Sequence, residues 1–269
     1  MRGNLEQRVY EHLVRKLSQG EISPGARLSE IALAQEIGVS RTPIREAFTR
    51  LRTEGVVDVL PRFGWFVRIP SRQEIVDLYE AREWLERFTA AQAAERGTAA
   101  DLDELQRLLE AMDQSLRDWR QRPRSVLESG SLHRTGALDR AFHEVIFRAA
   151  GNTWITRMGA QLEALGLAFN FKVILANAAS SQLLTLPKAG QERHIEELAR
   201  VWDVSVRDHH QIALAIRNRQ PRQAEELMTR HIRAGLETSL ATMDAWRRLH
   251  PREFDAMAMA ARQTAPLSR

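Results

Sequence analysis

The spacing of apolar residues changes its period within the first quarter of the chain, and this change constrains the fold more than any other feature. Apolar residues recur every three or four positions from Leu5 to about Gly55, which is the period of amphipathic helices. Two β-rich runs follow, at 56–60 and 65–69, separated by a Pro-Arg-Phe-Gly turn. From about 72 to 248 the helical period returns without a strand-like run. The sequence therefore predicts a mostly α protein with one small hairpin near its N-terminus.

Two short helices joined by a tight turn are expected just before the hairpin. Ser29 is placed to cap the first of them, and Gly38 is placed to end it. Ser40 is then placed to cap the second. Two such helices followed by a hairpin are typical of a winged helix-turn-helix, which we predict for a first domain at 1–70.

The remainder of the chain is predicted to be all α-helical, without strands. Helices are expected at 72–96, 100–120, 134–150, 153–178, 191–218 and 221–248. The polar stretch 121–135 is expected to be a loop. We expect a second domain at 71–250 and a C-terminal extension at 251–269, in which 257–261 could add a short helix.

Composition excludes several classes of protein. The chain has 269 residues and no cysteine, which excludes a disulfide scaffold, a thiol nucleophile and a cysteine-based metal site. No apolar run approaches the roughly 20 residues of a membrane span. The first twenty residues carry charges such as Glu6, Arg8 and Lys16, unlike the apolar core of a signal peptide. We therefore expect a cytoplasmic protein with no membrane partner.

The basic excess of the chain lies mostly in the predicted first domain. Residues 1–70 contain 11 Lys and Arg against 8 Asp and Glu, and the rest contains 28 against 27. Of the 39 basic residues 36 are arginines, whose planar fork suits phosphates and guanine edges. The excess indicates nucleic acid only weakly, because a bias toward arginine codons would produce it too.

Four residues at the start of the second short helix could contact DNA. In a winged helix-turn-helix the N-terminal residues of this helix reach the major groove, and here they are Ser40, Arg41, Thr42 and Arg45. Hydroxyls and helix N-terminal amides suit phosphate oxygens, and an arginine can bond guanine with two hydrogen bonds. The alternative is that Arg41 and Arg45, four residues apart, form only a solvated helix face.

Residues 5–69 resemble the DNA-binding domain of GntR-type bacterial transcription regulators. The matching stretches are 22–28, 37–47, 51–55 and the turn 61–67. The resemblance implies that Arg41, Thr42 and Arg45 read a double-stranded DNA operator. It also implies that the wing, with Arg62 and Gly64, reaches the adjacent groove or backbone. Ile31 stands where the family often has a charged residue, so one expected DNA contact is absent.

One carboxylate and three imidazoles could converge inside the bundle. Asp139 and His143 are four residues apart and share one helix face. His209 and His231 lie on two other predicted helices, at positions whose apolar neighbours point inward. Bundles build ligand sites from side chains of facing helices, and this donor set suits Zn²⁺, Ni²⁺ or Mn²⁺. The alternative is that each histidine is an ordinary core or surface residue.

Four stretches match a second family pattern: 82–86, 139–143, 150–152 and 209–231. On these stretches residues 72–240 resemble the effector-binding domain of the FadR-type subfamily, which implies an antiparallel all-α helical bundle. The resemblance implies a divalent metal, Zn²⁺ first, bound by Asp139, His143, His209 and His231. In the family the last two histidines are separated by about the interval found here, 231 − 209 = 22. His210 gives 21 and fits less well.

Arg82 is the residue that the resemblance places near the effector. A guanidinium there can pair with the carboxylate of a small organic acid. The alternative is an ion pair with Glu86, one helical turn later. Trp84, Phe142, Phe169 and Phe171 are available to line a cavity, although core packing is the favoured use of such residues.

The leading functional hypothesis is a one-component transcription regulator that is not an enzyme. A small organic acid bound in the bundle would change the affinity of a homodimer for its operator. Two other classes remain open at this point. One is a metal-dependent enzyme with an N-terminal docking module, and the other is a bundle that a metal stabilises without sensing anything.

Overall fold

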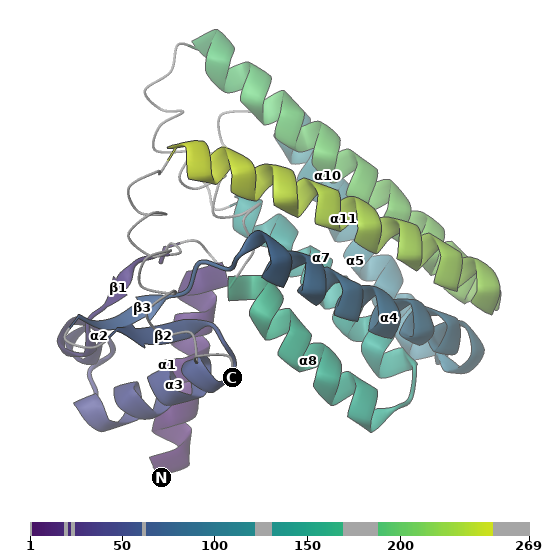
Figure 1. Ribbon diagram of the computed structural model, residues 1–269. Coiled ribbons are helices and arrows are strands. Elements are labelled where there is room, and N and C mark those ends of the chain that lie inside the picture. The colour runs from purple at the N-terminus through teal and green to yellow at the C-terminus, as the bar shows by residue number, and fades with distance from the viewer. Residues whose placement is uncertain are drawn as a thin grey trace, which may run out of the picture.

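The computed structural model describes residues 2–18, 21–22, 25–60, 63–121, 131–168 and 188–249. These residues form an N-terminal head and a bundle of long helices, with the head at one end of the bundle (Figure 1). The mostly α fold with one small hairpin is as predicted. Arg62, Phe169, Phe171 and the expected short helix at 257–261 lie outside the described residues.

The head is a winged helix-turn-helix. Its helices are α1 (Arg2–Ser18), α2 (Glu30–Ile37) and α3 (Arg41–Thr53). The Ser29 side chain caps α2 by accepting a hydrogen bond from Ala32 N. Gly38 ends α2 with a φ of 75°, a left-handed conformation that glycine adopts without strain. The turn between α2 and α3 therefore follows directly from the sequence.

The wing is a three-stranded antiparallel sheet rather than a hairpin alone. Strands β2 (Val57–Leu60) and β3 (Gly64–Val67) form the expected hairpin. Strand β1 (Arg27–Leu28) pairs with the other side of β3, so the order is β1-β3-β2. A two-residue strand contains no alternation of apolar and polar residues, which is why the sequence analysis missed it.

The bundle contains six long helices in the described part of the chain. They are α4 (Arg72–Arg96), α5 (Ala99–Gln121), α7 (Ser131–Ala149), α8 (Thr153–Ala168), α10 (Lys188–Arg217) and α11 (Pro221–Leu249). Helix α7 begins at Ser131, so the prediction of a loop up to position 135 was wrong in its last residues. None of these helices is long and apolar enough to cross a membrane, among the residues that the structure describes.

Helix α4 connects the head to the bundle. A capping box formed by Ser71 and Glu74 starts α4 directly after the wing. Helix α4 packs along α11 and also contacts α7, α8 and α10 (Figure 1). The hydroxyls of Tyr79 on α4 and Ser239 on α11 are 2.7 Å apart. Side chains from four helices can therefore meet beside α4.

One apolar cluster spans the head and the bundle. It contains the core of the head, including Leu13 of α1 and Phe48 of α3, both fully buried. The same cluster includes Ile75 of α4 and Met243 of α11, with Leu162 of α8 packed against it. Helix α1 also contacts α8 directly. The head is therefore packed against the bundle rather than joined to it only by a linker.

Candidate DNA-reading surface and metal centre

Helix α3 presents the two arginines that the sequence analysis proposed as DNA-reading residues. Its apolar face buries Ile44, Phe48 and Leu51 in the core of the head. Arg41 and Arg45 lie on the opposite side and are exposed. Their common face follows from the spacing of four residues on one helix.

Glu30 of α2 holds these two arginines together. Its Oε2 accepts hydrogen bonds from Nη2 of Arg41 and from Nε of Arg45, each 2.8 Å long. Its Oε1 accepts a 3.2 Å hydrogen bond from the indole N–H of Trp65 in the wing. Burial raises the pKa of Glu30, but these three hydrogen bonds outweigh burial and leave the pKa below its ordinary value. One ionised carboxylate thus links α2, α3 and the wing.

Sequence reasoning did not identify Glu30 as part of this surface. The available signal was its position directly after the capping residue Ser29, close to the turn that leads into α3. The signal was insufficient, because an acidic residue in the first turn of a helix is common for reasons of helix stability alone.

The other proposed DNA contacts lie around the same surface. Ser40 precedes α3 in an extended conformation, but its side chain makes no capping hydrogen bond, contrary to the expectation that it caps the helix. Thr42 is exposed in the first turn of α3. Gly64 begins β3 with a φ of 96°, which a β-carbon would strain. Ile31, which replaces a charged residue of the family, is exposed.

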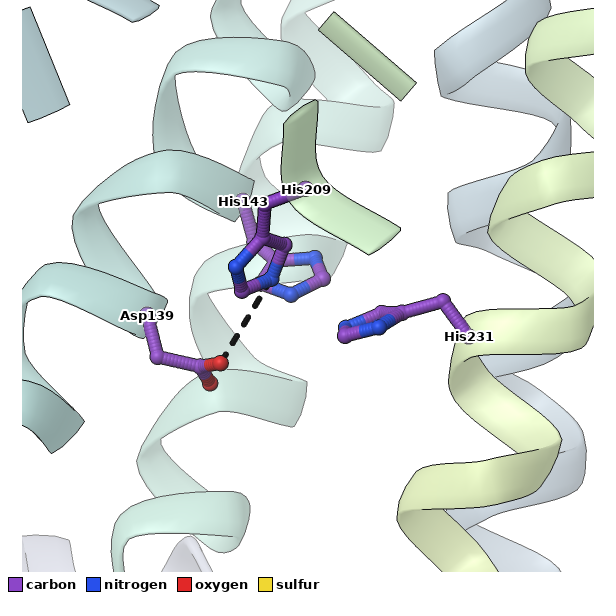
Figure 2. Close-up of side chains that lie close together, drawn as sticks. All are labelled: Asp139, His143, His209 and His231. Carbon is purple, nitrogen blue, oxygen red and sulfur yellow. Dashed lines mark ion pairs between the residues drawn. The ribbon is translucent and has the colours of Figure 1, made fainter. Parts of the chain in front are cut away.

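The bundle brings together the four proposed metal ligands. Asp139 and His143 lie on α7, His209 on α10 and His231 on α11, and Figure 2 shows their side chains pointing toward one another. One donor atom from each lies within 4.8 Å of the donor atoms of the other three. Nε2 of His209 is 3.5 Å from Oδ1 of Asp139. Three helices therefore supply one compact donor set.

This cluster has the chemistry and the burial of a metal-binding site. Histidines 143, 209 and 231 are buried, and Asp139 is partly exposed. Within the described part of the chain, Nε2 of His143 is buried and makes no hydrogen bond. Donor atoms around an ion that is bound at about 2.1 Å lie about 3 to 4 Å from one another. Small side-chain movements would therefore bring these four donors to bonding distance of a metal. Three imidazoles and one carboxylate are the ligands that Zn²⁺ and its neighbours prefer.

Two further acidic side chains lie beside the cluster. Oε2 of Glu86, on α4, is 2.5 Å from Nδ1 of His143, although the contact lacks the direction of a hydrogen bond. Oδ2 of Asp208, on α10, is 3.6 Å from Nδ1 of His231. Burial raises the pKa of both carboxyls. At Glu86, Arg82 and His143 lower the pKa by more than burial raises it. At Asp208, His231 lowers the pKa in the same way. Both pKa values therefore lie below the ordinary range.

Arg82 makes the ion pair that the sequence analysis offered as the alternative to effector binding. Its Nε donates a 2.7 Å hydrogen bond to Oε1 of Glu86. Burial lowers the pKa of Arg82, but the charge of Glu86, the charge of Tyr79 and the hydrogen bond to Glu86 together outweigh burial and raise the pKa above its ordinary value. Arg82 and the metal-ligand cluster are thus joined through Glu86.

The structure separates the remaining candidates. His210 points away from the cluster and contacts Asp113 at 3.1 Å, whereas His209 is fully buried within it. The suggestion that Trp84 lines an internal cavity was wrong, because 67% of this residue is exposed. Phe142 is buried, and its ring centroid is 4.4 Å from that of His209.

Comparisons with known proteins agree with this architecture. The model of the FCD domain matches residues 77–234, and the model of the bacterial regulatory proteins of the gntR family matches residues 5–67.

Two curated regulators and one solved structure are similar to this chain. The Nta operon transcriptional regulator of Aminobacter aminovorans is 39% identical over 34% of this chain and 44% of its own length. The HTH-type transcriptional regulator McbR of Escherichia coli is 32% identical over 62% of this chain and 74% of its own length. The solved structure of E. coli McbR/YncC has a TM-score of 0.65 at 22% identity, and covers 87% of this chain and 96% of that one.

The match to the FCD domain alone spans more than half of the sequence. The match to the gntR family lies ahead of it and covers the winged helix-turn-helix. The chain therefore belongs to the GntR family of bacterial transcription regulators, in the FadR-type group whose C-terminal domain is an FCD domain, and it is a regulator rather than an enzyme.

Proposed function

We propose that this regulator binds its operator as a homodimer and that a small organic acid, held at a divalent metal in the bundle, changes its operator affinity. The observation that carries the proposal is the cluster of Asp139, His143, His209 and His231, with donor atoms within 4.8 Å of one another. Because chromosomal DNA is the proposed target, we also propose that the protein works in the cytoplasm.

The four clustered side chains would hold the metal. Zn²⁺ is the first candidate for three imidazoles and one carboxylate, with Ni²⁺ and Mn²⁺ as alternatives. An ion that accepts five or six ligands supplies open positions, which the carboxylate oxygens of a small acid can fill. The partial exposure of Asp139 supports access to the cluster from outside the bundle.

Arg82 would hold a second acidic group of the same effector. Its Nε–H donates to Glu86, so its two terminal amino groups can approach another carboxylate. The guanidinium of Arg82 lies 5.0 Å from the centre of the Tyr79 ring. Because the hydroxyl of Tyr79 contacts Ser239, this stacking keeps the guanidinium beside α11. A dicarboxylate or a hydroxy acid is the class of effector that this arrangement favours.

The operator contacts proposed for the head are those of the α3 surface and the wing. Arg41 and Arg45 would read base edges, while Ser40 and Thr42 would bond to phosphates. Gly64 and Arg62 would bring the wing to the neighbouring groove or backbone.

Coupling between the bundle and the head would pass through the apolar cluster that they share. Ligand and DNA influence each other only if they favour different arrangements of the protein. Helices α4 and α11 line the metal centre and also contribute Ile75 and Met243 to the core of the head. A shift of either helix would therefore displace the DNA-reading surface.

Two pairs of exposed apolar side chains support the proposed homodimer. Trp84 and Phe88 are one turn apart on α4, and Trp154 and Met158 are one turn apart on α8. Helices α4 and α8 contact each other. Large apolar groups that remain exposed are typical of protein interfaces. A pseudo-palindromic operator needs two heads, which a symmetric pair supplies.

The test combines metal analysis with DNA binding. Operator duplexes would be selected from a random library, and anisotropy would measure their affinity as organic acids are added before and after chelation. We expect one divalent metal per chain and an acid whose effect disappears on chelation. That acid should stabilise the protein by about 2.7 kcal/mol at a hundredfold excess over its Kd.

Variants of the same chain separate the two parts of the proposal. Arg82→Ala should weaken the response to the acid without removing the metal. A response that persists unchanged after chelation would show that the metal takes no part in sensing. A metal-loaded protein whose DNA affinity no acid alters would instead be a bundle that the metal only stabilises.

A further inference from the structure

Two of the clustered imidazoles have a carboxylate beside Nδ1, and each carboxylate comes from a different helix than its imidazole. Glu86 of α4 lies 2.5 Å from Nδ1 of His143 on α7. Asp208 of α10 lies 3.6 Å from Nδ1 of His231 on α11. Nδ1 therefore faces a carboxylate in both rings, and in His143 the buried Nε2, which makes no hydrogen bond within the described residues, is the nitrogen left for an ion.

Glu86 is the more deeply placed of the two carboxylates. It is only 3% exposed, and its other oxygen accepts the 2.7 Å hydrogen bond from Arg82. A buried carboxylate is costly unless it is paired, and Arg82 supplies that pairing. Since an ionised carboxylate can only accept hydrogen bonds, its closeness to Nδ1 favours the tautomer of His143 that carries its proton there, although the ring must turn for the two groups to align.

We propose that Glu86 is a positioning residue of the metal centre, which fixes the orientation and the tautomer of His143 so that Nε2 faces the ion. This inference rests on the metal function proposed above. Carboxylates that bond the far nitrogen of a ligating histidine hold the ring in place and raise the basicity of the ligand. Arg82 holds Glu86 in place and so influences the metal centre indirectly, in addition to any contact with an effector.

The decisive variant is Glu86→Gln in the full-length chain, because it keeps the shape of the side chain and removes its charge. Glu83→Gln is the matched control: Glu83 lies on the same helix, but pairs with Arg233 on the outside of the bundle. Affinity for Zn²⁺ would be measured by competition with a chelator. We expect a loss of about 10- to 100-fold for Glu86→Gln and none for Glu83→Gln.

A second variant distinguishes an effect on metal binding from an effect on folding alone. Glu86→Gln leaves the guanidinium of Arg82 without its acidic partner, so the double variant Arg82→Gln/Glu86→Gln removes both charges together. Thermal unfolding of the metal-free proteins would show whether each variant is folded. The double variant should fold and still bind Zn²⁺ more weakly than the wild type.

Cobalt provides a readout that stability alone does not affect. The absorption spectrum of Co²⁺ reports its coordination geometry, and we expect it to change in Glu86→Gln but not in Glu83→Gln. Wild-type Zn²⁺ affinity in either folded Glu86 variant would overturn the positioning role. A wild-type chain that binds neither Zn²⁺ nor Co²⁺ would instead overturn the proposed metal function.

Discussion

The carboxylate of Glu30 accepts a 2.8 Å hydrogen bond from Nε of Arg45, across the turn of the helix-turn-helix. The same oxygen holds Arg41, so the two arginines are already oriented before DNA arrives. Holding long side chains in one geometry removes conformational freedom that binding would otherwise have to remove.

Arg45→Ala should weaken operator binding and relax the preference at one base pair. A two-bond contact with guanine contributes about 1–3 kcal/mol of discrimination, which alanine cannot replace. Selection from a random library would measure the preference. Arg52→Ala is the control, since Arg52 is exposed near the other end of α3. Unchanged base preference in Arg45→Ala would refute the reading role of this residue.

Glu30→Gln should lower the ratio of specific to non-specific DNA affinity. Loss of the carboxylate frees both arginines from a fixed geometry and weakens specific contacts. It also removes a negative charge near the phosphates, which strengthens non-specific binding. Titrations of operator and scrambled duplexes at several salt concentrations would separate the two effects. A ratio equal to that of the wild type would mean that Glu30 does not orient the arginines for DNA.

His209→Ala should abolish metal binding, while His210→Ala should leave it intact. The two residues are adjacent in sequence, but His209 lies in the cluster and His210 contacts Asp113. Imidazoles bind a metal only when deprotonated, so occupancy in the wild type should fall below roughly pH 6.5. Elemental analysis after dialysis at several pH values measures both effects. Equal metal content in the two variants would contradict the assignment.

Replacing Trp84 and Phe88 together by serine should shift the protein toward monomers. Both side chains are large, apolar and exposed on one face of α4. Light scattering coupled to size-exclusion chromatography would report the mass over a range of concentrations. Leu214→Ser removes an exposed apolar residue from α10 and serves as the control. A mass that stays the same in the double variant would place the interface elsewhere.

The head should lose stability in alkali through Tyr10. Its hydroxyl donates a 2.8 Å hydrogen bond to Glu54, and burial together with Glu54 raises the pKa of Tyr10 to about 12. Because the folded-state pKa exceeds the unfolded value of about 10, this stabilisation is complete below about pH 10 and disappears as the pH rises through 12. Urea unfolding at increasing pH measures the loss.

Tyr10→Phe tests that assignment directly. The variant lacks the ionisable hydroxyl, so the part of the alkaline loss that is due to Tyr10 should be absent. It should also be less stable at neutral pH by about 1 kcal/mol, the net contribution of one hydrogen bond. The same alkaline loss in both proteins would show that another group causes it.

The sequence predicted those parts of the structure that depend on helical period and local capping. The choice of His209 over His210 followed from the interval of 22 residues that the family resemblance implies, and the structure buries His209 while His210 contacts Asp113. The start and end of α2 followed from Ser29 and Gly38 for the same local reasons.

Contacts between helices could not be predicted in the same way. The pairing of Arg82 with Glu86 was visible as a spacing of four residues, but the contact of Glu86 with His143 depends on how α4 packs against α7. Glu30 escaped notice because its partners lie on α3 and β3. The prediction for Trp84 was wrong because the residue type alone does not reveal which face of a helix remains exposed.

The apolar cluster that head and bundle share restricts the exchange of parts between regulators of this kind. A chimera that joined this head to a foreign bundle would need residues equivalent to Leu162 and Met243, or it would leave part of the shared apolar cluster exposed. In the reverse chimera, a foreign head joined to this bundle at the start of α4 would leave Ile75 and Leu78 without the rest of their apolar cluster. Functional chimeras should therefore carry a matched set of contacts from α4, α8 and α11 along with the head.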